Sequence, residues 1–210
     1  MKKILTIIIL FSACTSKGQN SFDTIINKGF YKSYFNLKIK LPIAVVYTLY
    51  QGGGEASRKS DNFINDTKIP MLTNKDYAGS GYDKGHLVPA EDFAYDDSLQ
   101  NLTFRFYNCI PQTPNLNRGK WKGIESKTRR FSRLDTICVV NFMTYDTVKT
   151  SSVSFYVPKV CYKAVYNLSN NLMLSCWGYE NTSENKEVKI SDNVLLIFNL
   201  FYELNKRPKK

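Results

Sequence analysis

Residues 108–125 have the sequence NCIPQTPNLNRGKWKGIE, and their spacing predicts a functional site on a helix. In a helix, Asn117, Trp121 and Glu125 stand at positions i, i+4 and i+8, which drift by only about 80° around the axis. The Cα atoms of Asn117 and Glu125 are then about 12 Å apart along the axis. That separation favours Asn117 as a metal ligand and Glu125 as a residue that holds a water. The competing interpretation is an amphipathic helix anchored by its tryptophan, with incidental polar residues.

The chain contains one histidine, His86, within the segment YDKGHLVPA at residues 82–90. Histidine is the only side chain whose ordinary pKa lies near neutral pH. A general base or an imidazole metal ligand that acts near neutrality must therefore be His86. Because the amide oxygen of Asn117 is a hard ligand suited to Mg²⁺, His86 is left as the general base. The sequence shows no evident cluster of carboxylates, which favours one ion over a two-metal site.

Together the two segments resemble the DNA/RNA non-specific endonucleases, the family of secreted bacterial sugar-non-specific nucleases and of mitochondrial endonuclease G. That family carries a DRGH-type motif, then an asparagine, then Asn-x-x-x-Trp-x-x-x-Glu. The resemblance covers about residues 40–180, and the residues that carry it are Asp83, Gly85, His86, Asn108, Gln112, Asn117, Trp121 and Glu125. Lys84 departs from the pattern, because it replaces the arginine of the motif and loses a bidentate fork. Arg58, before Phe63, resembles the family's arginine near the scissile phosphate.

The resemblance implies an α+β fold with a mixed, largely antiparallel central sheet flanked by helices and a ββα-metal (His-Me finger) motif. It implies a metal-dependent endonuclease that hydrolyses phosphodiester bonds in DNA and RNA with little sequence specificity, using Mg²⁺, with Mn²⁺ or another divalent cation as an alternative. His86, Glu125, Asn108 and Arg58 are the expected catalytic residues and Asn117 the metal ligand; Lys84, Arg118 and Lys120 are expected to contact phosphates. A non-catalytic nucleic-acid-binding surface protein and an interbacterial toxin effector on the same fold are the alternatives.

The overall charge is consistent with a polyanionic partner. The chain has 210 residues, of which 43 % are hydrophobic and 22 % charged, which is typical of a globular protein rather than a disordered one. Its formal net charge is +11, with an isoelectric point near 9.3. Such an excess favours nucleic acid, anionic lipid or an acidic polymer as partner, although a lysine-rich solvated surface gives the same number.

The N-terminus predicts an exported protein. Lys2 and Lys3 precede a short apolar run, Ile4–Phe11, and residues 1–18 are typical of a signal peptide. Ser12-Ala13-Cys14 resembles a lipobox, which would place a lipid on Cys14, whereas cleavage near Gly18 would release a soluble protein. We therefore expect a periplasmic, outer-membrane-anchored or extracellular bacterial protein. Residues 19–40 are expected to be an N-terminal lead-in, 41–205 the nuclease domain and 206–210 a basic tail.

Hydrophobic patterning predicts one mixed domain. Strands are expected at 41–49, 102–110 and 135–145, with two more within 153–179, and helices at 90–99, after 111 and at 191–204. Residues 55–80 are expected to form a long surface loop. If the last two strands form a hairpin centred between Leu168 and Ser169, Cys161 and Cys176 lie opposite each other. This arrangement predicts a disulfide between them.

Overall fold

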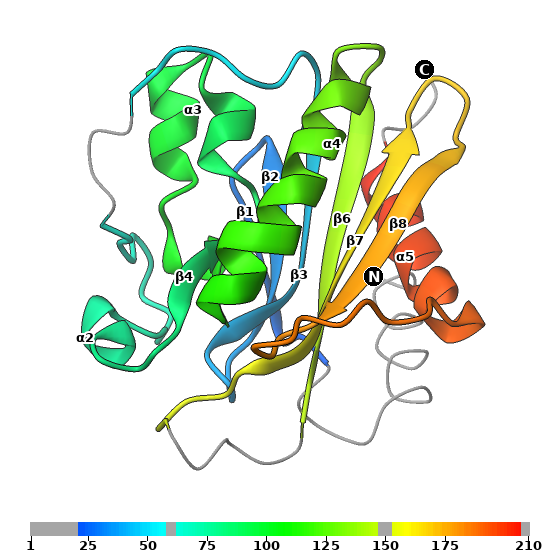
Figure 1. The fold of residues 1–210 in the computed structure, drawn as a ribbon. Coiled ribbons are helices and arrows are strands. Elements are labelled where there is room, and N and C mark those ends of the chain that lie inside the picture. Colours follow the sequence, from blue (N-terminus) through cyan, green and yellow to red (C-terminus); the bar gives the residue numbers. More distant parts are fainter. Residues whose placement is uncertain (1–20, 58–61, 147–152, 207–210) are drawn as a thin grey trace.

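A computed structural model describes residues 21–57, 62–146 and 153–206 (Figure 1). The predicted signal segment with Cys14, the arginine at position 58 and nearly all of the basic tail lie outside the described residues. The centre of the fold is a six-stranded sheet in the order β1-β2-β3-β6-β7-β8, in which every neighbouring pair is antiparallel. A second, two-stranded sheet pairs β4 with β5. The predicted α+β class with a largely antiparallel sheet is confirmed.

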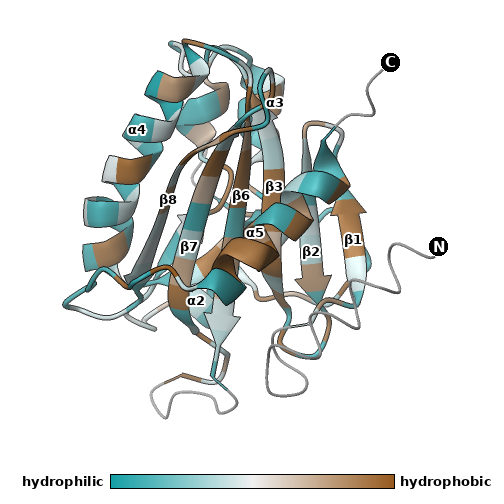
Figure 2. Cartoon of the chain, turned by 90° about the vertical axis from the view of Figure 1, so that its right-hand side faces the viewer, coloured by the Kyte–Doolittle hydropathy of each residue, from teal (hydrophilic) through white to brown (hydrophobic). Residues whose placement is uncertain are grey.

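The two central strands are β3 (Leu41–Leu49) and β6 (Ile137–Tyr145), and both are buried along almost their whole length. Their sequences lack the alternation of a half-exposed strand because both faces of the sheet are covered. The helix α5 (Asp192–Asn205) packs on one face, and β5 (Cys109–Gln112) with the helices before and after it covers the other (Figure 2). These central strands match the predicted strands at 41–49 and 135–145.

Residues 19–40 were expected to be an N-terminal lead-in, but the described part of this segment, from residue 21, contributes to the main sheet. They contain β1 (Thr24–Asn27) and β2 (Tyr31–Asn36), which extend the main sheet from β3 to its edge. The mixed polar composition arises because β1 is an edge strand with one buried residue, Ile26. β2 is mostly buried, so the packed sheet begins before residue 41.

The strand predicted at 102–110 is wrong over most of its length. Residue 102 ends α3 (Asp97–Leu102), residues 106–108 form η2 (Phe106–Asn108), and only residues 109 and 110 are extended, as the start of β5. The helix predicted at 90–99 is divided between η1 (Ala90–Phe93) and α3. The α3 helix starts where the Asp96 carboxylate accepts hydrogen bonds from two backbone amides. The aromatic residues of this stretch alternate with polar ones and are buried because the turns pack them against the sheet. A period-two pattern of apolar residues looks the same in such turns as in a strand, so it does not distinguish the two.

The last hairpin consists of β7 (Pro158–Asn167) and β8 (Met173–Glu180), as expected, but its register excludes the predicted disulfide. Cys161 pairs with Tyr179 and Cys176 with Ala164, so the two cysteines are not cross-strand neighbours. These pairs centre the hairpin on Asn170, C-terminal to the centre assumed between Leu168 and Ser169. All four described cysteines are free thiols. Within the residues that the structure covers, no helix has the length and apolar character needed to cross a membrane.

Candidate active site

The predicted site residues meet in one cleft of about 920 Å³ on the face of the sheet that carries the β4–β5 hairpin. β4 (Asp83–His86) pairs with β5, and the chain then enters η3 (Leu116–Trp121) and α4 (Lys122–Ser132), which completes a ββα arrangement. The cleft is lined by Phe63, Asp83, Lys84, His86, Pro89, Ala90, Glu91, Phe104, Asn117, Arg118, Lys122, Glu125 and Arg129. The structure therefore brings together five of the predicted residues, namely Lys84, His86, Asn117, Arg118 and Glu125.

His86 is held at the end of β4 by its backbone and by aromatic neighbours. Its strand position pairs with Cys109 on β5, and the indole Nε1 of Trp121 donates a hydrogen bond to the His86 carbonyl at 3.3 Å. The imidazole packs between Phe63 and Phe104, with ring centroids 4.6 and 4.8 Å away. These contacts restrict the ring's orientation while leaving it on the cleft wall.

Asn108 does not line the cleft, and its contacts are consistent with the role the resemblance implies for it, which is to orient the His86 region or support the metal shell. Its side chain is fully buried and bridges backbone groups: Oδ1 accepts from the Val88 amide, and Nδ2 donates to the carbonyls of Val88 and Thr103. A side chain committed in this way cannot touch a substrate. Asn108 instead fixes the segment that follows His86, because the Leu87 amide also donates to the Asn108 carbonyl.

The helix that carries Asn117 begins as a π-helix. Asn117 and Glu125 line the cleft, and Trp121 is fully buried, with its indole Nε1 donating to the His86 carbonyl. Positions four apart in a π-helix still lie on nearly the same side, so this placement is compatible with the prediction that the three residues share one face. A π-helix turns less per residue than an α-helix, and such segments are frequent at functional sites. Gly119, in the middle of the segment, lowers the local preference for α-helix.

Asp83 links the hairpin to this helix and orients two predicted site residues. Its carboxylate accepts a bidentate pair from Arg118 at 2.7 and 2.8 Å and a hydrogen bond from Asn117 Nδ2 at 3.0 Å. Partial burial raises the pKa of Asp83, but the hydrogen bonds from Arg118 and Asn117 outweigh it and lower the pKa below the ordinary value. Asp83 is thus an anion that positions Arg118 and Asn117.

The remaining predicted cations differ in placement. Lys84 lines the cleft, donates to Asn74 Oδ1 at 2.9 Å and lies 5.4 Å from the centre of the Phe63 ring. Lys120 is exposed on η3 and is not among the residues that line the cleft. Its predicted contact with phosphate would therefore lie at the margin of the site, whereas Lys84 sits beside His86.

The side-chain oxygen atoms in the cleft are suitable ligands for a hydrated divalent cation. Because Asn117 uses its amide nitrogen to donate to Asp83, its Oδ1 is the atom that it can offer to an ion. Asp83 and Glu125 supply carboxylates on the same walls, and oxygen ligands suit Mg²⁺ or Mn²⁺. Among the described residues, no group of three or more His, Cys, Asp or Glu side chains could hold a metal ion. This is compatible with an ion that takes few protein ligands and keeps several waters.

Sequence reasoning missed a buried charged cluster beneath the cleft. Asp92 is fully buried and accepts from Tyr47 OH at 2.7 Å and from Arg129 Nη1 at 2.9 Å. Burial raises the pKa of Asp92, an effect opposed by Lys163, Tyr47 and Arg129. The pair holds α4 against η1. A buried acid in a short turn gave no pattern that would have identified it.

Lys163 completes this cluster from the centre of β7. It is fully buried, with its Nζ 5.0 Å from the centre of the Trp121 ring. Burial lowers the pKa of Lys163, while Glu125 and Asp92 act in the opposite direction. The sequence signal for this buried charge was the position of Lys163 in the middle of the mostly apolar strand PKVCYKAVYN. The cluster connects the sheet to the Trp121 and Glu125 side of the site.

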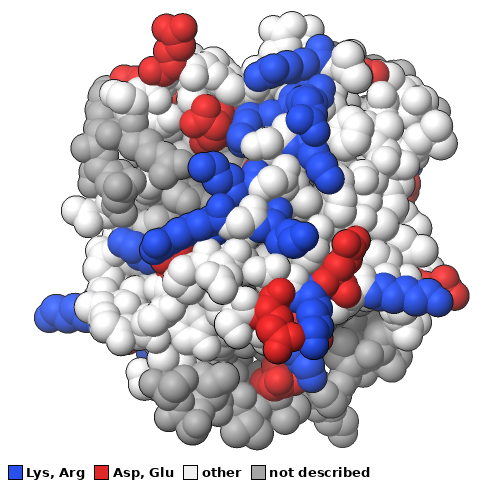
Figure 3. Space-filling model, viewed as in Figure 1, with Lys and Arg blue, Asp and Glu red and all other residues white. Residues whose placement is uncertain are grey.

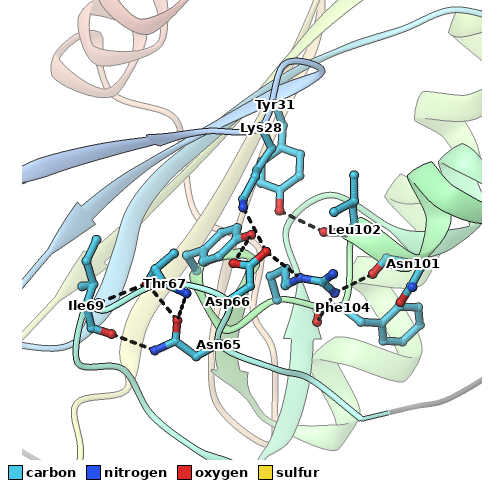
Figure 4. A network of polar contacts seen from close by, with 11 residues as sticks. Lys28, Tyr31, Asn65, Asp66, Thr67, Ile69, Asn101, Leu102 and Phe104 are labelled. Atoms are coloured by element: carbon cyan, nitrogen blue, oxygen red, sulfur yellow. Dashed lines mark hydrogen bonds and ion pairs between the residues drawn. The ribbon is translucent and has the colours of Figure 1, made fainter.

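Asp66 anchors the loop that supplies Phe63 to the cleft (Figure 4). Its carboxylate accepts from Lys28 Nζ at 2.9 Å, from Arg105 Nε at 3.2 Å and from Tyr107 OH at 2.9 Å. Partial burial raises the pKa of Asp66, but these three donors prevail and lower it below its ordinary value. The 62–73 region is therefore an ordered wall of the site, not only the surface loop that the sequence predicted.

Replacing Asp66 by alanine should lower the free energy of unfolding by about 2–3 kcal/mol at pH 7, because it removes hydrogen bonds from charged donors. Since the folded carboxyl has the lower pKa, its stabilisation is present above about pH 4 and is lost as pH falls through the folded pKa. Urea unfolding at pH 7 and at pH 3 measures this difference. Asp146→Ala is the matched control, because among the described residues the ion pair of Asp146 is with the exposed Lys159 at 3.3 Å, and its loss should cost under about 1 kcal/mol. An equal loss in both variants would contradict the anchor.

The chain is similar in sequence to a known protein family and to several of its members. The DNA/RNA non-specific endonuclease family matches residues 13–196. Endonuclease G of Bos taurus is 30 % identical over 109 residues, which cover 50 % of this chain and 33 % of the relative. Nuclease 1 of Schizosaccharomyces pombe is 31 % identical over 144 residues, covering 65 % and 41 %. A cyanobacterial nuclease from Nostoc is 39 % identical over 80 residues, covering 36 % and 29 %.

The fold is also that of a solved structure. A chain in a crystal structure of an EndoG/EndoGI complex superimposes with a TM-score of 0.65 at 20 % identity, covering 89 % of this chain and 86 % of the other. At that identity the likeness shows the fold alone. The matched stretches span less than half the length of the curated relatives named above. Because the family match runs over most of the sequence, this chain belongs to the DNA/RNA non-specific endonuclease family.

Proposed function

We propose that this protein is a metal-dependent endonuclease that hydrolyses phosphodiester bonds in DNA and RNA with little sequence preference. The observation that carries the proposal is the single cleft that joins the only histidine of the chain to Asn117, Glu125 and a set of cations. Family membership and the names of the related nucleases support it. The substrate phosphates would bind in this cleft.

The chain's own residues divide the chemistry as follows. His86, on the cleft wall, takes a proton from the attacking water. Lys84 and Arg118 present positive charge to the phosphate oxygens, and Asp83 holds Arg118 in place. Asn117 would hold a divalent cation through Oδ1, and Glu125 would orient water beside it. When bound, the cation supplies charge stabilisation for the phosphate and the leaving oxygen.

Chelation of divalent metal separates this mechanism from the non-catalytic alternative. We expect the protein to cleave plasmid DNA and RNA in Mg²⁺ or Mn²⁺ and to lose both activities in EDTA, because the divalent ion would stabilise the leaving oxygen as well as the phosphate, to which the cations of the cleft only add. Gel electrophoresis of plasmid and RNA with each metal measures this. Cleavage that persists in EDTA would argue against metal dependence. Binding without cleavage in every metal would favour the non-catalytic or effector interpretation.

We also propose that the mature protein is exported, with support from the basic and apolar N-terminal sequence. The Ser12-Ala13-Cys14 segment supports a lipid anchor at Cys14. Fractionation of cells that express the full chain and a Cys14→Ser variant tests both points. An anchored protein will move from the membrane to the soluble fraction in the variant. Retention of the unprocessed chain in the cytoplasm would overturn export.

A further inference from the structure

The helix that follows the site carries far more positive than negative charge. Residues 116–133 contain one acid, Glu125, and seven bases, which are Arg118, Lys120, Lys122, Lys127, Arg129, Arg130 and Arg133. Figure 3 shows Lys and Arg side chains gathered in a band across the face that carries α4. We define the α4 ridge as Lys122, Arg130 and Arg133, the exposed cations on the outer side of this helix.

The ridge faces away from the core. At about 100° per residue, Arg133 lies about 20° and Arg130 about 80° from Lys122, whereas the buried Ile124 and Thr128 lie roughly opposite. Eleven residues separate its ends, which is about 16 Å along the axis. This length equals about five steps of one strand of B-form DNA at about 3.4 Å per step.

The α4 ridge begins at the cleft of the candidate site and ends beside the loop formed by residues 51–54, which contains three glycines. Lys122 lines the cleft, and the backbone amides of Gln51 and Gly52 donate to Ser132 at the other end of α4. Gly53, with φ +122°, lies beside the Arg133 guanidinium. Gly53 adds no side chain beside the exposed Arg133 guanidinium.

The ridge cations are exposed and unneutralised, unlike some other surface lysines. Lys159 pairs with Asp146, Lys186 with Glu184 and Lys206 with Glu203, whereas Lys38 and Lys40 share the unpaired state of the ridge among the described residues. Within the described parts of the chain, none of the three ridge cations forms an ion pair. Like charges three or four residues apart, such as Arg130 and Arg133, repel each other and weaken a helix. An anionic ligand bound between them would reduce this repulsion.

We propose that the α4 ridge is a binding surface for the nucleic-acid backbone, and that it holds the phosphates of about five nucleotides flanking the cleaved bond. This inference rests on the proposed function, because it extends the same strand from the cleft. The contacts are ionic and carry no base information. Arg129 is not counted, because Asp92 already holds it.

The test uses the full protein with His86→Ala in EDTA, so that binding is measured without cleavage. Fluorescence anisotropy follows labelled single strands of about 12 and about 4 nucleotides at several salt concentrations, and the salt slope reports the phosphates contacted. We expect Arg130→Gln/Arg133→Gln to lower the slope by about 1.4 for the longer strand, at about 0.7 per lost contact. The slope for the shorter strand, which cannot reach the ridge, should stay unchanged.

The matched control is Lys38→Gln/Lys40→Gln, which removes two exposed charges from the turn that precedes β3. This double variant should leave the salt slopes for both strands unchanged. An unchanged slope in the ridge variant, or an equal loss in the control, would overturn the proposal. So would a ridge variant that loses binding to phosphatidylglycerol vesicles but keeps its slope on the longer strand. Cleavage by the wild-type protein is assayed separately, so failure of the ridge and failure of the nuclease function give different results.

Discussion

His86→Ala should reduce cleavage of both DNA and RNA by about a hundred- to ten-thousandfold, the range that a general base contributes. The reason is that the chain has one histidine, so no second imidazole can take the proton. Nucleic acid should still bind, because the cations of the cleft and of α4 are unchanged. Single-turnover cleavage at saturating protein, with binding measured by anisotropy, separates the two effects.

Two controls make this result specific to the base. Circular dichroism should show an unchanged fold, since the contacts that secure β4 at His86 come mainly from its backbone. Imidazole added to the buffer should restore part of the activity, because the alanine leaves a space on the cleft wall between Phe63 and Phe104. Hydrolysis near the wild-type rate in His86→Ala would exclude His86 as the base.

Asn117→Ala should reduce activity by roughly a hundredfold or more at low Mg²⁺, because loss of even an outer partner of a metal site costs about 10–100-fold in metal affinity. The variant removes the one neutral oxygen ligand predicted in the cleft. Asp83 keeps its bidentate pair with Arg118, so the site should stay assembled. Activity measured over a Mg²⁺ titration should show the midpoint moved to higher concentration.

Asn115→Ala is the matched control for this variant. Asn115 lies two residues away in the same segment, but its amide donates to the Ser183 carbonyl and does not line the cleft. Its Mg²⁺ midpoint should equal that of the wild type. A midpoint that moves equally in both variants would indicate distortion of η3 instead of a lost ligand, and an unmoved midpoint in Asn117→Ala would remove the residue from the metal site.

Local patterns in the chain were sufficient for several elements. The apolar run at 41–49 and the capped segment at 191–204 predicted β3 and α5 nearly residue for residue, because burial and capping leave a periodic record in the sequence. Ser191 accepts from the Val194 amide as an N-cap should. The strands β1 and β2 and the short helical turns were missed because their positions depend on partners that are distant in the sequence.

The candidate site likewise combines residues that the sequence identified with contacts that only the structure shows. Spacing and residue type, together with the family resemblance, selected His86, Asn117, Glu125 and Lys84, which one cleft brings together. They could not reveal that backbone hydrogen bonds occupy the Asn108 side chain, or that Trp121 is fully buried. A side chain's role depends on which groups surround it, and a linear pattern does not record those groups.

The sequence by itself therefore determined the chemistry that this protein can carry: one imidazole, an amide ligand, and an excess of cations. Only the tertiary structure decided which of these groups meet. It brought Asp83 to Arg118 across 35 residues and Asp66 to Arg105 across 39, and it placed Lys163 under Trp121. Such pairs form because sheet register and helix packing, summed over many distant contacts, set the distances on which electrostatic and hydrogen-bond energies depend.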